Sequence, residues 1–258
     1  MKQILLCLLF LMIVQGSLCA QERTYITETD DYIAWQPGVK LTFDMFKNPK
    51  PSEKDSVLMA KYGLKAERYT GFYYILDVPK KARRKGGWKD GLGEKAYFCA
   101  MFSKHQSWMS VRDSFELQMS QVIWDIEEWG TRLSRKYLSD MEKQFQEANG
   151  GHKTTGVISI FYVDACRHGR KWKKQLMNEF IHNVVFPSDT TKYHEYRKMV
   201  DELLADTEDY ASTPEEAERF LLNKPVDPRY KKADFTMGDP DLDEDVVRND
   251  SVPNVQVK

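Results

Sequence analysis

This chain of 258 residues lacks several features that would assign it to a common functional class. It has no excess of either charge, with 38 Lys and Arg against 39 Asp and Glu, and this argues against a dedicated nucleic-acid-binding protein, because such domains are usually clearly basic. No two of its five histidines have the spacing His-x-x-x-His, so a helix cannot offer such a pair to a metal ion. The chain also has no internal repeat.

Cysteines and long apolar runs are scarce as well. Two of the four cysteines lie in the first twenty residues, which leaves Cys99 and Cys166 for the rest of the chain. These two could form one disulfide in an oxidising compartment, or remain as two buried thiols, and the sequence favours neither. After the N-terminal stretch, no apolar run is long enough to cross a bilayer, so we expect no stable membrane span.

The first twenty residues have the three parts of a secretory signal peptide. Lys2 supplies a positive charge, residues 4–14 are apolar, and mostly small residues follow up to Ala20. Leu18 stands where signal peptidase prefers a small residue, so the cleavage bond is not fixed, and it also argues against a lipid anchor on Cys19. We therefore expect an exported protein, periplasmic or extracellular after the signal peptide is removed.

The remaining length suits one large domain or two small ones, and composition decides between them. From residue 224 onward, prolines and acidic residues replace apolar ones, and such a segment buries too little apolar surface to offset the entropy of ordering. We expect a signal peptide over residues 1–20, a single domain over 21–223 and a disordered acidic tail over 224–258.

Apolar periodicity predicts an α+β fold, with strand-like segments early in the chain and helical segments later. The expected strands are a short run from residue 33 to the turn at Pro37-Gly38, then residues 57–69, 73–78, 96–102 and 156–163. The expected helices are residues 107–145, 170–185, 190–204 and 213–222. Residues 96–102 are apolar on both faces, which is typical of a central strand. The pattern as a whole predicts a small antiparallel or mixed sheet packed on a long amphipathic helix, with a helical C-terminal part.

The helix expected over residues 107–145 carries a continuous apolar stripe, because its apolar residues recur every three or four positions. Ser110 or Asp113 could cap its start, and Asn149-Gly150-Gly151 would end it. Gly130 costs a helix interior about 1 kcal/mol relative to alanine, and a close helix-on-sheet contact would explain its presence.

Three separated segments contain motifs in a fixed order. The first two combine Trp35, Leu41, Phe43, Asp44 and Phe46 with Phe102, Ser107 and Trp108. The long helix then contributes Leu117, Met119, Ser120, Gln121, Ile123, Trp124, Asp125, Ile126, Glu128 and Arg132. Together they resemble a family of bacterial exported proteins, domain-of-unknown-function family 922, over residue 35 to about residue 180. A late Thr-x-His-Gly element of that family is similar to residues 166–169. The resemblance implies a zincin-like fold.

The chemistry of a zincin does not carry over with the resemblance. A zincin helix needs two imidazoles one turn apart for Zn²⁺ and a glutamate as general base. Here Met119 and Ile123 stand at the imidazole positions and Ser120 at that of the base. We interpret Met119, Ser120, Ile123 and Asp125 as vestigial motif positions, and we expect Met119 and Ile123 to fill the core. The alternative is an open cleft that binds a peptide or glycan without cutting it.

Three further residues are candidates if a site exists: His105, Cys166 and His168. A metal site made of His105, His168 and Asp125 requires that folding brings them together, and otherwise each histidine has an ordinary surface or hydrogen-bonding role. Cys166 with His168 suggests a thiol nucleophile. Residues two apart, however, point the same way only on a strand, and the thiol also needs a lowered pKa.

We therefore expect an exported, non-catalytic protein that binds or scaffolds an unidentified protein or polymer of the cell envelope, without a cofactor or a nucleic-acid partner. The alternatives are a secreted metal- or thiol-dependent hydrolase with unconventional residues, and a purely structural envelope protein. The basic run at residues 80–85, with Trp88 nearby, is expected to be a solvated hairpin tip. Contact of this run with an anionic envelope polymer or lipid phosphate is its alternative interpretation.

Overall fold

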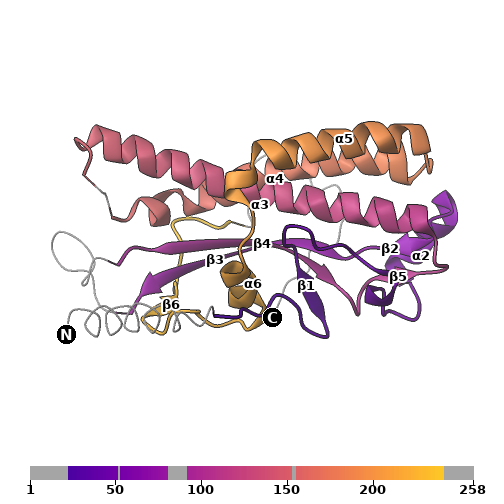
Figure 1. Ribbon diagram of the computed structural model, residues 1–258, viewed down its shortest axis with the longest axis horizontal. Helices are drawn as coiled ribbons and strands as arrows, with labels where there is room; N and C mark the ends of the chain where they lie inside the picture. Colours follow the sequence, from indigo (N-terminus) through magenta and orange to yellow (C-terminus); the bar gives the residue numbers. More distant parts are fainter. Residues whose placement is uncertain (1–22, 52, 81–91, 153–154, 241–258) are drawn as a thin grey trace, which may run out of the picture.

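The computed structural model describes residues 23–51, 53–80, 92–152 and 155–240. A four-stranded antiparallel sheet is covered on one face by long helices, which confirms the α+β class (Figure 1). In spatial order its strands are β1 (Tyr32–Ala34), β4 (Lys95–Ser103), β3 (Thr70–Pro79) and β6 (Tyr230–Lys232). A separate pair consists of β2 (Ala66–Glu67) and β5 (Trp108–Met109).

The α-helices are α2 (Glu53–Tyr62), α3 (Ser114–Ala148), α4 (Val157–Phe180), α5 (Thr190–Asp206) and α6 (Pro214–Leu221). Shorter helical turns are η1 (Phe43–Met45), η3 (Ile181–Val185) and η4 (Glu208–Tyr210).

Strand β4 lies inside the sheet, as its apolar sequence predicts, and both of its faces are buried. Phe98 and Ala100 face the α3 side, where they join two of the core clusters. Cys99 and Met101 face the other way and pack with Ala217 of α6. Successive side chains of a strand point to opposite faces, so the sheet separates a thick layer of helices from the single helix α6 (Figure 1).

This arrangement also decides the state of the cysteines. Cys99 and Cys166 are not joined in a disulfide, and neither residue has exposed surface. Cys99 belongs to the α6 side of the sheet, whereas Cys166 packs with Phe98 on the opposite side. The disulfide alternative is therefore wrong, and the two cysteines are buried thiols.

The first part of α3 lies between the sheet and the helical layer formed by α5 and the end of α4, whereas the start of α4 packs directly on the sheet (Figure 1). Asp113 caps its start, since its side chain accepts hydrogen bonds from the amides of Phe115 and Glu116. The expected start at residue 107 is wrong, because Trp108 and Met109 form β5 instead. Asn149 follows the last turn, as the sequence predicts.

Two segments expected as strands are helical. Residues 156–163 form the start of α4, where Tyr162 and Val163 pack on the sheet; this packing overrides the strand preference of a run rich in β-branched and aromatic residues. Residues 57–62 of the run at 57–69 belong to α2, which ends before Gly63 with φ +63° and a hydrogen bond from Leu64 N to Met59 O, whereas residues 66–67 form β2.

The expectation of disorder from residue 224 is wrong for residues 224–240. Tyr230 is buried, and the strand it begins pairs with the end of β3. Hydrogen bonds from Lys80 N to Arg229 O and from Ala233 N to Leu76 O, both 2.8 Å, flank this pairing.

The expected signal peptide, residues 81–91 of the basic segment and residues 241–258 lie outside the described residues. None of the helices in the described ranges combines the length and apolar character needed to cross a bilayer.

Gly130 marks a contact between two helices, not the helix-on-sheet contact expected. A Cβ atom added at Gly169 of α4 would lie 2.3 Å from the carbonyl oxygen of Gly130 and 2.2 Å from Oγ of Ser134. Ser134 Oγ donates across this contact to the carbonyl of Ala165 at 2.8 Å. The absence of a side chain at Gly169 therefore lets α4 approach α3 closely.

Replacing Gly169 by alanine is predicted to lower the free energy of unfolding by about 1–3 kcal/mol, despite the better helix propensity of alanine, because the backbone of α3 would have to move. Gly93→Ala is the control: its added Cβ meets nothing within 4 Å, and stability should stay level or rise by up to about 1 kcal/mol. Urea denaturation of both variants measures the difference. Equal stability of the two would contradict the close helix contact.

Candidate functional site

Two of the four vestigial motif positions, Met119 and Ile123, lie on the face of α3 that packs against other helices. Met119 has no exposed surface and Ile123 is 6% exposed. Both belong to one core cluster with Phe180 at the end of α4, Val184 of the short π-helical segment η3 and Tyr196 of α5. Met119 and Ile123 therefore fill the core, as the apolar stripe predicts.

Ser120, at the position of the zincin base, is engaged in a buried polar contact. Its hydroxyl donates to the carbonyl of Glu116 at 2.6 Å and accepts a hydrogen bond from Arg68 Nε at 2.7 Å. Arg68 also pairs with the Glu116 carboxylate. Burial lowers the pKa of Arg68, and the charge of Glu116 opposes that shift. The Ser120 hydroxyl is thus held by a guanidinium and a backbone carbonyl.

Asp125 is 2% exposed, and both of its carboxylate oxygens are occupied. One oxygen accepts hydrogen bonds from Trp35 Nε1 and Gln121 Nε2, each at 2.8 Å. The other accepts from Arg197 of α5 at 2.6 Å. Burial alone would lower the pKa of Arg197, but the carboxylates of Asp125 and Asp201 together raise it. Asp125 therefore joins three parts of the chain as a structural acceptor.

A shallow pocket of about 350 Å³ lies beside this contact. It lies against α3 and α5 and is lined by Lys40, Leu41, Leu117, Gln118, Gln121, Tyr193, Arg197 and Asp201. Met119 and Ile123 are not part of this lining. The guanidinium of Arg197 already donates to Asp125 and to Asp201, both at 2.6 Å. The pocket is thus open, with both apolar and charged side chains in its lining, and neither Met119 nor Ile123 contributes to it.

The structure separates Cys166 from His168. Residues two apart on a helix project in different directions, so Cys166 and His168 lie on different sides of α4. The Cys166 side chain is buried in the core. His168 is half-buried, with its ring centre 5.3 Å from that of Tyr137 and 6.5 Å from that of Trp172. Burial, with a smaller effect from Lys171, lowers the pKa of His168.

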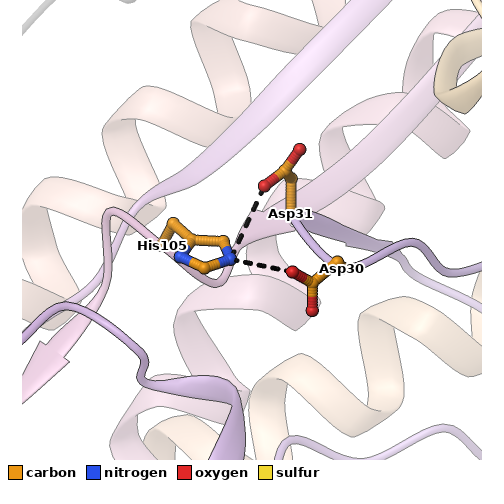
Figure 2. Close-up of side chains that lie close together, drawn as sticks. All are labelled: Asp30, Asp31 and His105. Atoms are coloured by element: carbon orange, nitrogen blue, oxygen red, sulfur yellow. Dashed lines mark hydrogen bonds and ion pairs between the residues drawn. The ribbon is translucent and has the colours of Figure 1, made fainter.

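His105 instead lies with two aspartates that the sequence reasoning missed (Figure 2). Its Nε2 atom is 3.4 Å from an oxygen of Asp30 and 3.6 Å from an oxygen of Asp31. Among the described residues, these three side chains form the only group whose potential metal-ligand atoms all lie within 4.8 Å of one another. The alternative site of His105, His168 and Asp125 is therefore not assembled within the part of the chain that the structure describes. The only sequence signal for the observed cluster is the adjacent Asp30-Asp31 pair before β1.

A scan against protein-family models and searches of curated proteins and of solved structures found no match to this chain. The resemblance to family 922 consequently depends on the motifs alone and stays an interpretation.

Proposed function

We propose that this is an exported protein that acts without catalysis, binding or scaffolding a protein or polymer of the cell envelope, and that α3 is a degenerate zincin helix. The observation that supports this best is the complete burial of Met119 among side chains of α4 and α5, with Ile123 one turn away in the same cluster. A catalytic metal needs an open coordination position for water and substrate. The corresponding face of α3 is instead used for packing.

Contacts between motif positions support the zincin-like part of the proposal. Trp35 of the opening pattern and Asp125 of the helix are 90 residues apart in sequence and are joined by the 2.8 Å hydrogen bond described above. The guanidinium of Arg132, another motif position, lies over the Trp35 ring at 5.0 Å from its centre. Residues that match the family in sequence thus contact one another in space.

The thiol-dependent alternative has less support. A nucleophilic cysteine must be an accessible thiolate, usually with a pKa lowered by a nearby positive charge. Cys166 and Cys99 have no exposed surface, and burial raises the pKa of Cys99 well above its ordinary value. These surroundings keep Cys99 a neutral thiol, and Cys166 is shielded from any substrate.

A binding role fits the open pocket beside Gln121 and Arg197. Its lining combines charged and amide side chains with Leu41, Leu117 and Tyr193, which suits a ligand with both polar and apolar groups, such as a glycan or an extended peptide. Binding there needs no change in the packing of α3. The pocket is consequently the place where we propose that an envelope component is held.

Placing histidines at the former ligand positions tests the non-catalytic proposal. The double variant Met119→His/Ile123→His is predicted to lose about 3–5 kcal/mol of unfolding free energy, because two polar rings would enter the core without partners. The matched control is Lys143→His/Glu147→His, an exposed pair with the same spacing near the end of α3. Its stability should change by less than about 0.5 kcal/mol.

Denaturation with and without ZnCl₂ is the measurement. Zinc should raise the free energy of unfolding of the control variant by more than it does for the unaltered protein. For Met119→His/Ile123→His, zinc should bring no such additional increase. A core pair that folds normally and is stabilised by zinc would show that positions 119 and 123 face a metal-accessible cleft, which contradicts the proposal.

Export is tested by N-terminal sequencing of the full chain after expression in its own organism. We expect a product that begins near Gln21 and is recovered outside the cytoplasm, partly with washed envelope fragments. Leu8→Arg, which interrupts the apolar segment, should keep the protein inside with its first residues intact. An uncleaved cytoplasmic product from the unaltered chain would contradict export, and complete recovery in the soluble fraction would contradict envelope binding.

A further inference from the structure

The cluster of Asp30, Asp31 and His105 combines residues from two distant parts of the chain. The aspartates lie in the turn before β1, and His105 lies in the loop between β4 and β5 (Figure 2). Pairing of β1 with β4 places Tyr32 opposite Ser103, and so brings the turn and the loop together although they are 75 residues apart. The cluster therefore follows directly from the register of the sheet.

Lys104 fixes the turn and the loop relative to each other. Its backbone N–H donates to the carbonyl of Asp31 at 2.8 Å, and its ammonium donates to the carbonyl of Thr29 at 2.6 Å. Lys104 is only 4% exposed. The spacing of the three side chains thus depends on buried backbone contacts as well as on their mutual attraction.

The ligand atoms have the spacing that a small metal ion requires. Ligands about 2.1 Å from a tetrahedral zinc ion lie about 3.4 Å from one another. The imidazole nitrogen of His105 is 3.4 Å from an oxygen of Asp30 and 3.6 Å from one of Asp31, and the three ligand atoms all lie within 4.8 Å of one another. One nitrogen and two carboxylate oxygens favour Zn²⁺ and similar transition metals over Mg²⁺ or Ca²⁺, which prefer oxygen ligands alone.

The neighbouring ion pair with Lys47 leaves part of the Asp30 carboxylate available. Lys47 binds one oxygen of Asp30, while the other oxygen faces His105. The side chains of Asp31 and His105 are 69% and 50% exposed, which leaves room for water to complete the coordination of an ion.

We propose that Asp30, Asp31 and His105 form a surface binding site for one divalent transition-metal ion of the Zn²⁺ class. The bound ion would link the turn before β1 to the loop after β4. This site is separate from the vestigial positions of α3, so neither its presence nor its absence decides whether α3 is degenerate.

Isothermal titration of the untagged mature protein with ZnCl₂ tests the site. We expect one saturable site, with affinity lowered at least about tenfold in His105→Ala and in Asp31→Asn, because losses in the outer shell of a metal site alone cost about 10–100-fold. His194→Ala is the control, since this histidine is also exposed and lies on α5, and it should bind zinc as the unaltered protein does. A thermal unfolding scan confirms that each variant folds.

Three results would overturn the proposal. The first is the absence of saturable binding in the unaltered protein, and the second is equal affinity in His105→Ala. The third is displacement of zinc by an equal concentration of Ca²⁺, which would contradict the assignment to a transition metal. Retained binding in His194→Ala with loss in both cluster variants supports it.

Discussion

The carboxylate of Glu128 has no exposed surface, and the position of α3 depends on how this charge is satisfied. It accepts a hydrogen bond from Arg132 Nε at 2.9 Å, and from the amide and hydroxyl of Ser212 at 2.8 and 2.5 Å. A buried charge without partners costs several kcal/mol, so α3 is stable only in the register where these groups meet. The same register places Met119 and Ile123 against α4 and α5, which is why the face that resembles a metal-binding helix is closed.

Arg135 extends this arrangement to the sheet. Strand β1 ends opposite Met101, so the β1 side of β4 has no strand partner at Phe98. Arg135 donates to the backbone carbonyl of Phe98 at 2.6 Å. The backbone amide of Phe98 donates to the carboxylate of Glu216 in α6 at 3.4 Å. Burial alone would lower the pKa of Arg135, but the carboxylates of Glu216 and Glu128 raise it. Arg135 and Glu216 thus satisfy the backbone hydrogen-bonding groups of Phe98 that lack a strand partner. Their ion pair also connects α3 on one face of the sheet with α6 on the other.

Local signals in the sequence predict some of these elements and not others. The capping box from Thr213 to Glu216 predicts the start of α6 within one residue. The apolar stripe predicts both the helix α3 and the burial of Met119 in the core. The start of α4 is missed because a short apolar run suits a buried strand or a buried helix equally well. The short strand β6 and the Asp31–His105 cluster depend on pairing between distant segments, which periodicity within one segment does not contain.

The central claim is that the part of α3 that resembles a metalloprotease motif is closed core. Native-state hydrogen exchange along α3 tests it most directly. The account predicts that amides of residues 119–128 exchange only through global unfolding, with the full denaturant dependence of that transition, while residues 143–147, which are exposed, exchange through local fraying. Rapid exchange at residues 119–123 with little denaturant dependence would show that this face opens to solvent, and would contradict the account.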